Sequence, residues 1–96
     1  NKISIIIPAY NEEATISTVI DKLLNLTFIN NIKKEIIIVN DCSFDYTEKL
    51  ILDIIKRNEE VEIVYFKHEK NSGKGAAIHT GIKNATGDYL IIQDET

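Results

Sequence analysis

Four short runs rich in isoleucine and valine, separated by segments with helical spacing, constrain the fold of this chain more than any other feature. They cover Ile3 to Ile7, Glu35 to Val39, Val61 to Phe66 and Tyr89 to Ile92. Each run is close to the roughly five residues of a typical strand. The first two are apolar almost throughout, which is typical of parallel strands that are covered on both faces. The sequence therefore predicts four strands of one parallel sheet.

The segments between these runs show the spacing of amphipathic helices. In the first two segments, apolar residues recur three and four positions apart, as in a helix with one buried face. They are Ile16, Val19, Ile20, Leu23 and Leu24 in the first segment, and Leu50, Ile51, Ile54 and Ile55 in the second. Asn11 is expected to cap the first helix, and Asp45 or Thr47 to lie at the start of the second. A third helix is predicted from about Lys74 to Ala85, although Gly81 inside it costs roughly 1 kcal/mol relative to alanine.

Strands and helices thus alternate along the chain in the order β-α-β-α-β-α-β. Because crossovers between parallel strands are right-handed, this order predicts an α/β fold with a doubly wound parallel sheet. The chain has 96 residues, of which 44% are hydrophobic and 27% charged, so we expect one folded domain. The first apolar run ends at Pro8 and is too short to span a membrane.

Charge and cysteine content narrow the partners and the compartment. The net charge of -4 provides no broad positive field for a phosphate polymer, so nucleic acid is not an expected partner. Cys42 is the only cysteine, which fits a reducing compartment. We therefore expect a cytoplasmic protein.

Polar residues follow the predicted strands at the edge where ligands bind. In open parallel sheets this edge lies beyond the carboxyl ends of the strands, where loops and helix N-termini converge. The four strand ends carry Pro8-Ala9-Tyr10-Asn11-Glu12, Asn40-Asp41-Cys42-Ser43-Phe44-Asp45, Asn71-Ser72-Gly73-Lys74-Gly75 and Gln93-Asp94-Glu95. Carboxylates, an aromatic ring and a glycine-flanked lysine are gathered there, which indicates a binding site.

Each strand end suits one part of a nucleotide. Tyr10 offers a ring, Glu12 can accept hydrogen bonds from ribose or base, and Asp41 can accept the ring N–H of uracil or guanine. The glycines beside Lys74 allow the backbone to approach a diphosphate, next to the lysine charge and a helix N-terminus. Asp94 is a natural ligand for Mg or Mn. Plainer roles remain open: Glu12 at a helix start, Lys74 in a solvated turn and Asp94 as a cap or a solvated carboxylate.

Several other readings of the sequence are disfavoured. Cys42, His68 and His79 have no spaced partners and receive no catalytic role. Gly73-Lys74-Gly75 lacks the serine or threonine of a P-loop, and Ile78 stands where a dinucleotide-binding motif needs its third glycine. A receiver-like signalling domain would carry an acidic pair where Pro8-Ala9-Tyr10 stands.

The segments IIIPAYNEEATI, IIIVNDCSFDYT and NSGKGAAIHTGIKNATGDYLIIQD together resemble family 2 glycosyltransferases, particularly the polyprenyl- or dolichyl-phosphate mannosyltransferase-like branch. The resemblance implies the Rossmann-like half of a glycosyltransferase A-type fold. It also implies a GDP- or UDP-sugar donor held at the positions of Pro8, Ala9, Tyr10, Glu12, Asp41, Gly73, Lys74 and Asp94. Asp94 would hold the divalent metal, Mg or Mn. The reaction implied is an inverting sugar transfer, with a polyprenyl phosphate in the membrane as the favoured acceptor and the cytoplasmic membrane face as its location.

The resemblance also implies that residues 1–96 form the nucleotide-sugar-binding half of a longer domain. The catalytic base and the acceptor half are then expected beyond Thr96, and this chain by itself is expected to be inactive. The sequence departs from the family pattern at Asn40 and Cys42, where aspartate and glycine are common, and at Thr96, where a second carboxylate is expected. A nucleotide-binding module without catalysis is the alternative function.

Overall fold

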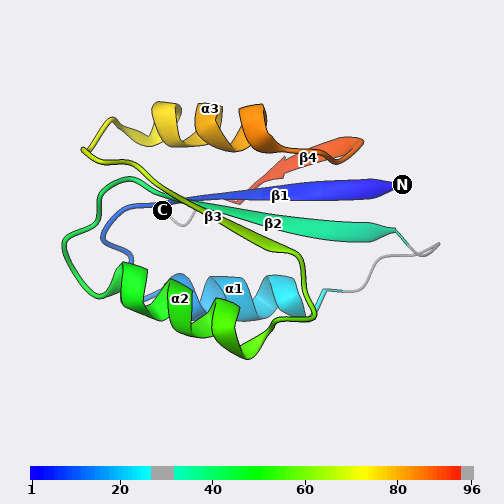
Figure 1. The fold of residues 1–96 in the computed structure, drawn as a ribbon, viewed down its shortest axis with the longest axis horizontal. Helices are drawn as coiled ribbons and strands as arrows, with labels where there is room; N and C mark the ends of the chain where they lie inside the picture. Colours follow the sequence, from blue (N-terminus) through cyan, green and yellow to red (C-terminus); the bar gives the residue numbers. More distant parts are fainter. Residues whose placement is uncertain (27–31, 94–96) are drawn as a thin grey trace.

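The computed structural model describes residues 1–26 and 32–93, which form four strands and three helices in the predicted order (Figure 1). The strands are β1 (Lys2–Ala9), β2 (Lys33–Asn40), β3 (Ile63–Lys67) and β4 (Tyr89–Ile92). The helices are α1 (Ile16–Leu24), α2 (Thr47–Arg57) and α3 (Lys74–Asn84). Within these described ranges, no helix has the length and apolar character needed to cross a membrane.

The strands form one parallel sheet in the order β3-β2-β1-β4. Helices α1 and α2 lie on one side of this sheet and α3 on the other (Figure 1). The predicted α/β fold with a doubly wound parallel sheet is therefore confirmed. In Figure 1, the chain leaves β1, β2 and β3 toward the same side of the molecule, as parallel strands require.

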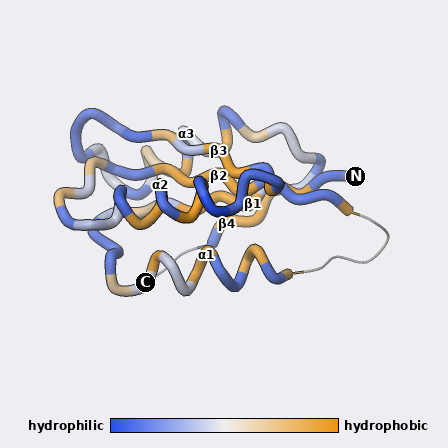
Figure 2. Tube along the Cα trace, turned by 60° about the horizontal axis from the view of Figure 1, so that its bottom comes forward, coloured by the Kyte–Doolittle hydropathy of each residue, from blue (hydrophilic) through white to orange (hydrophobic). Residues whose placement is uncertain are grey.

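The two central strands explain the continuous apolar runs. Successive side chains of a strand point to opposite faces. Ile5 and Ile7 of β1 belong to the core beneath α1 and α2, whereas Ile6 belongs to the core beneath α3. Both faces are covered, so neither face tolerates a polar side chain without a partner. Figure 2 shows the hydrophobic strands in the middle of the molecule and the alternating hydrophobic and hydrophilic turns of α1.

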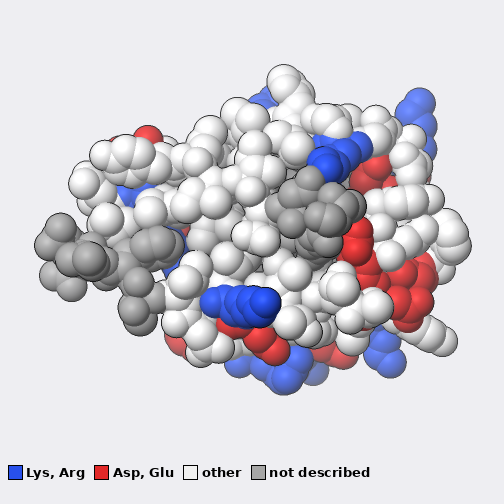
Figure 3. Space-filling view, turned by 180° about the vertical axis from the view of Figure 1, so that it is seen from behind, with Lys and Arg blue, Asp and Glu red and all other residues white. Residues whose placement is uncertain are grey.

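Strand β4 is exposed, in contrast to the buried central strands β1 and β2. Its residues Tyr89, Leu90, Ile91 and Ile92 are 58%, 47%, 42% and 45% exposed. The physical reason is its place at the edge of the sheet, where it pairs only with β1 in the described residues. Figure 3 views the molecule from behind, on the side of β4, and shows a broad area without charged side chains.

Helix α3 lies so close to β1 that Gly81 cannot carry a side chain without a rearrangement. A Cβ atom built on Gly81 would lie 2.5 Å from Cγ2 of Ile6, and Ile6 is fully buried. The glycine that costs helix propensity therefore permits close helix-to-sheet packing. The sequence showed that Gly81 lowers the helix propensity of α3. The structure shows that the same glycine allows α3 to pack closely against Ile6 of β1.

Helix α1 begins later than the sequence suggested. It starts at Ile16, after a turn in which the amides of Thr15 and Ile16 both donate to the Glu12 carbonyl. The prediction that Asn11 caps this helix is therefore wrong. Asn11 has φ of 50° and joins two loops: its amide donates to Ser43 Oγ at 2.9 Å, and its Oδ1 accepts from Phe44 N at 3.0 Å.

The buried carboxylate of Glu35 in β2 links β1 to the segment before β4, near the amino ends of these strands. Glu35 is 2% exposed, and its oxygens accept hydrogen bonds from the Ser4 hydroxyl at 2.7 Å and from the Thr86 amide at 2.9 Å and hydroxyl at 3.0 Å. Lys2 Nζ lies 3.4 Å from Glu35 Oε2. Burial by itself would raise the pKa of Glu35, but the hydrogen bonds from Ser4 and Thr86 outweigh it and lower the pKa to about 2.

Candidate functional site

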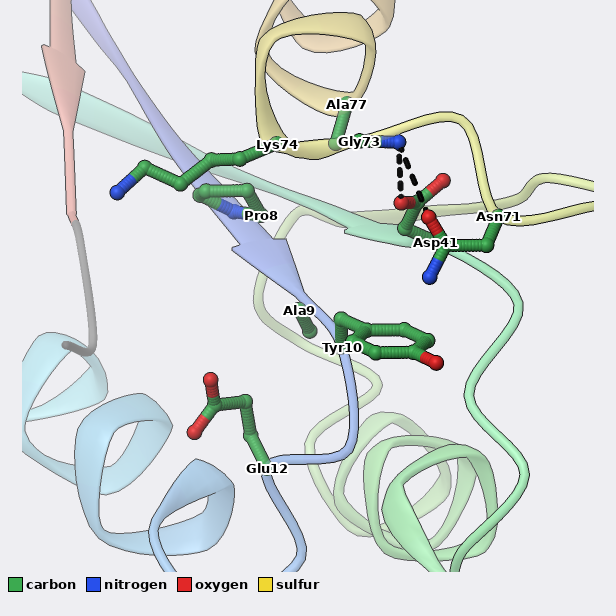
Figure 4. A pocket seen from close by; sticks show the side chains of 9 residues that line it. All are labelled: Pro8, Ala9, Tyr10, Glu12, Asp41, Asn71, Gly73, Lys74 and Ala77. Atoms are coloured by element: carbon green, nitrogen blue, oxygen red, sulfur yellow. Dashed lines mark hydrogen bonds between the residues drawn. The ribbon is translucent and has the colours of Figure 1, made fainter.

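A pocket of about 230 Å³ lies at the carboxyl ends of β1 and β2, beside the first turn of α3 (Figure 4). It is lined by Pro8, Ala9, Tyr10, Glu12, Asp41, Asn71, Gly73, Lys74 and Ala77. The parallel sheet explains this gathering, because the strands end at one edge and deliver their loops to it. Residues that are far apart in the sequence thus form one cavity.

The structure brings together the predicted binding residues that it describes. Pro8, Ala9, Tyr10, Glu12, Asp41, Gly73 and Lys74 all line this pocket. Asp94, predicted to bind the metal, lies outside the described residues. Sequence reasoning did not assign Asn71 or Ala77 to the site: Asn71 stands beside the glycine cluster, and Ala77 follows one turn into α3. The roles of these residues in nucleotide binding stay predictions.

The end of β1 contributes the apolar part of the pocket. Pro8 lies within β1, next to its last residue. Proline has no backbone N–H to donate to a neighbouring strand. It is tolerated there because β4 pairs with β1 only from Ile3 to Ile6, so no hydrogen bond to β4 is lost at Pro8. Tyr10 follows the strand and is 40% exposed, and its ring meets Phe44 edge-on with centroids 6.3 Å apart. This places an aromatic ring at the pocket mouth.

Glu12 is held at its backbone. Its amide donates to Thr47 Oγ1 at 2.8 Å, and Thr47 is fully buried at the start of α2. Its Oε2 accepts a longer hydrogen bond of 3.3 Å from the Thr15 hydroxyl. In Figure 4 the Glu12 carboxylate lies on the opposite side of the pocket from α3. The side chain therefore offers acceptors to a ligand across from the glycine loop.

Asp41 is the most constrained side chain of the pocket. The residue is only 3% exposed. Its Oδ1 accepts from Ser72 N at 2.9 Å and lies 2.8 Å from His68 Nδ1, while its Oδ2 accepts from Gly73 N at 2.8 Å. Burial by itself would raise the pKa of Asp41, but the Ser72 amide, the His68 ring and the Gly73 amide outweigh it and hold the pKa below its usual value. Asp41 is thus an ionised anchor for the loop before α3.

The backbone at Gly73 explains why a glycine precedes Lys74. Gly73 has φ of 95° and ψ of 161°, a conformation that is essentially restricted to glycine. The chain turns there into α3, whose first residue is Lys74. The first turn of a helix leaves N–H groups without intrahelical partners, and it favours anions. In Figure 4 the Lys74 side chain runs over Pro8, on the other side of the view from Asp41.

Two departures from the family pattern have visible structural roles. Asn40 Oδ1 accepts from Ser43 N at 2.9 Å and its Nδ2 donates to the Tyr65 hydroxyl at 3.0 Å, so this side chain shapes the loop after β2. Cys42 has φ of 62°, the left-handed region that favours glycine. The loop therefore keeps the backbone conformation of a glycine at the cost of some strain.

His68 and Asp45 do not line the pocket, although His68 contacts the pocket residue Asp41. His68 contacts both Asp41 and Thr80, although residue spacing in the sequence indicates no partner for it. Asp45, expected at the start of the second helix, accepts from Thr47 N at 2.9 Å. Among the residues in the described ranges, no three His, Cys, Asp or Glu side chains are grouped in a way that could hold a metal ion.

The fold and the pocket define a doubly wound α/β domain with a cavity at the carboxyl edge of its sheet. The chain belongs to a known family: the model described as "Glycosyl transferase family 2" matches residues 4–95. This confirms the family that the sequence motifs indicated.

Relatives of known activity extend far beyond this chain. A dolichyl-phosphate beta-glucosyltransferase of Dictyostelium discoideum is 34% identical over 99 residues, which cover 96% of this chain and 30% of that protein. A poly-beta-1,6-N-acetyl-D-glucosamine synthase of Staphylococcus aureus is 38% identical over 92 residues, covering 96% of this chain and 21% of the synthase. The chain thus spans between about a fifth and a third of the length of these relatives.

Solved structures share the fold. The mannosyltransferase PcManGT from Pyrobaculum calidifontis, in complex with GDP-Man and Mn2+, matches with a TM-score of 0.88 at 24% identity, covering 96% of this chain and 26% of that chain. TarS 1-349 from S. aureus, in complex with UDP, matches with a TM-score of 0.82 at 29% identity, covering 98% of this chain and 27% of that chain. These similarities confirm the predicted Rossmann-like half of a glycosyltransferase A-type fold.

Proposed function

We propose that this chain binds the nucleotide of a sugar donor, within a protein that transfers the sugar from a nucleotide diphosphate to an acceptor. One observation carries the proposal: residues that suit base, ribose and diphosphate, from the loops after β1 and β2 and from the start of α3, line the same pocket. Family membership supports the reaction type. The complexes of similar proteins with GDP-Man and with UDP support a donor of this chemical class.

The size of the pocket suits only part of a nucleotide sugar. Whole small ligands commonly occupy roughly 300 to 1,000 Å³. The pocket of about 230 Å³ is smaller, so it would enclose one end of a nucleotide sugar. Tyr10 and Asp41 favour the base at that end, because one supplies a ring and the other an acceptor for a ring N–H. The sugar would then extend from the pocket toward the acceptor.

Lys74 and the start of α3 would bind the diphosphate. A lysine ammonium beside a helix N-terminus stabilises negative charge, and this matters most when the diphosphate departs. The left-handed backbone of Gly73 sets the direction in which α3 and Lys74 meet the ligand. The acceptor oxygen would attack the anomeric carbon from the opposite face, and a single displacement of this kind inverts the configuration.

A divalent metal fits the proposal through Asp94 rather than through the described residues. Mg and Mn prefer carboxylate and phosphate oxygens. The two pocket carboxylates differ: Asp41 already accepts three hydrogen bonds, while Glu12 accepts one at 3.3 Å from Thr15. Asp94 is the proposed metal ligand, and a bound metal would supply charge neutralisation for the phosphates. The Mn2+ in the PcManGT complex supports this choice of metal.

The acceptor and the location belong to the proposal as well. A polyprenyl phosphate acceptor is supported by the motif resemblance and by the dolichyl-phosphate glucosyltransferase among the relatives. The cytoplasmic membrane face, as the location, follows from the motif resemblance alone. The glucosamine-polymer synthase, of higher identity, supports a polysaccharide acceptor instead. We favour the lipid phosphate, and transfer assays with both acceptors distinguish them.

Calorimetry with matched lysine variants tests the proposed binding. UDP, GDP, uridine and guanosine are titrated into the chain with and without Mn2+. Lys74→Ala should weaken nucleoside diphosphate binding by roughly 10- to 100-fold, because a charge-assisted contact contributes about 1.5–3 kcal/mol. Nucleoside binding should change little. Lys70→Ala is the control, since Lys70 is exposed in the same loop but does not line the pocket. The proposal would be contradicted if Lys74→Ala and Lys70→Ala bound each nucleoside diphosphate with the same affinity. It would also be contradicted if the wild-type chain bound neither UDP nor GDP.

The transfer reaction needs a longer protein that contains this chain. There, Asp94→Asn should abolish metal-dependent transfer while leaving the circular dichroism spectrum unchanged. Unchanged turnover with Mg or Mn would count against Asp94 as the metal ligand. Nucleotide binding without any transfer would support the alternative, a binding module without catalysis.

A further inference from the structure

His68 joins three parts of the molecule around the pocket. It directly follows β3, and its side chain is only 17% exposed. Its Nδ1 lies 2.8 Å from Asp41 Oδ1 at the end of β2, and its Nε2 lies 2.8 Å from Thr80 Oγ1 in α3. Both ring nitrogens therefore have a partner, and one of these partners lines the pocket.

Hydrogen-bond chemistry determines the direction of this chain of contacts. An ionised carboxylate only accepts hydrogen bonds, so the proton facing Asp41 must be on His68 Nδ1. In the neutral ring, Nε2 then accepts from the Thr80 hydroxyl. The structure therefore requires a proton on His68 Nδ1, which both the neutral Nδ1–H tautomer and the doubly protonated ring carry.

Counting acceptors on Asp41 shows what His68 accomplishes. A carboxylate offers about four lone-pair positions. Oδ1 receives the Ser72 amide and the His68 ring, and Oδ2 receives the Gly73 amide. Among the contacts made by residues 1–26 and 32–93, this leaves one position, and it is on Oδ2. The terminal torsion of an aspartate is broad, so the neighbours of the carboxylate decide how its two oxygens are presented.

We propose that His68 is a positioning residue that orients the Asp41 carboxylate, so that a single acceptor on Oδ2 is presented to a ligand that donates an N–H group. This inference rests on the proposed function, and it narrows the ligand to bases with a ring N–H. His68 acts through Asp41 and does not line the pocket itself. The tie to Thr80 keeps the ring in place against α3.

Two amide substitutions separate the two contacts of the ring. In His68→Asn, the side-chain amide stands at the δ position and can still donate to Asp41. In His68→Gln, the amide stands at the ε position and can still reach Thr80. If His68 positions Asp41, the asparagine variant should bind UDP or GDP within about threefold of the wild type, and the glutamine variant should lose roughly tenfold. If His68 only linked β3 to α3 through Thr80, the glutamine variant should instead bind more tightly than the asparagine variant.

His79 provides the matched control. It is the other histidine of the chain and is exposed on α3. His79→Gln should leave nucleotide affinity unchanged. Thermal unfolding of all three variants establishes that they are folded. Binding is then compared at a temperature below the lowest unfolding midpoint of the three.

NMR spectroscopy tests the positioning without a ligand. The ¹⁵N shifts of His68 should show a protonated Nδ1. The amide signals of Ser72 and Gly73, which both donate to Asp41, should move in His68→Gln and much less in His68→Asn. If the wild type binds neither nucleotide, the proposed function is wrong, and these shifts still decide whether His68 orients Asp41. An Nε2–H tautomer, or amide signals unmoved in His68→Gln, would overturn the inference.

Discussion

Replacing Gly73 by alanine tests whether its backbone conformation builds the pocket. A Cβ atom at Gly73 would meet no atom within 4 Å, so the substitution creates no clash. Its φ of 95° and ψ of 161° are nevertheless in a region that alanine avoids. Holding alanine there costs about 1–3 kcal/mol. The alternative is a change in the backbone, which would withdraw the Gly73 amide from Asp41.

Gly75 is the matched control for this substitution. It lies two residues further on, within α3, and a Cβ atom there also meets nothing within 4 Å. Alanine is favoured over glycine in a helix by up to about 1 kcal/mol. Gly75→Ala should therefore be neutral or slightly stabilising. The two variants differ in backbone conformation and not in crowding, and their free energies of unfolding should differ by roughly 1–4 kcal/mol.

Urea denaturation followed by circular dichroism measures this difference. Nucleotide titration of the same proteins should show weaker binding for Gly73→Ala and wild-type binding for Gly75→Ala, because only the first disturbs the loop that carries Lys74. Unfolding free energies that agree within about 0.5 kcal/mol would refute the reasoning from backbone strain.

Two stability measurements test the packing and the buried carboxylate. Gly81→Ala places a Cβ 2.5 Å from Ile6 Cγ2, so it should be about 1–3 kcal/mol less stable than Gly75→Ala by urea denaturation; equal stabilities would contradict the close packing of α3. Glu35 has its pKa lowered from 4.5 to about 2, so its stabilising contribution of roughly 3 kcal/mol is complete above pH 4.5 and is lost as the pH falls toward 2. The difference in unfolding free energy between wild type and Glu35→Gln should shrink over that range, and a constant difference would argue against an ionised Glu35.

The local pattern of the sequence was sufficient for the elements and for most of the site. Continuous apolar runs predicted strands near their observed bounds, because a strand covered on both faces is apolar at most positions. The third helix was predicted from about Lys74 to Ala85 and is observed at Lys74–Asn84. The pocket residues were predictable because parallel strands deliver their carboxyl ends to one edge. The start of α1 was not, since Asn11 bonds to a loop 32 residues away rather than to its own helix.

The sequence by itself determined the alternation of strands and helices, the family, and the gathering of Tyr10, Glu12, Asp41 and Lys74 at one edge of the sheet. Only the tertiary structure decided that His68 meets Asp41, that Gly81 must be small and that β4 is exposed. The physical reason is range. Strand and helix patterns depend on neighbours within a few positions, whereas His68 and Asp41 are 27 residues apart and meet only when β2 and β3 pair.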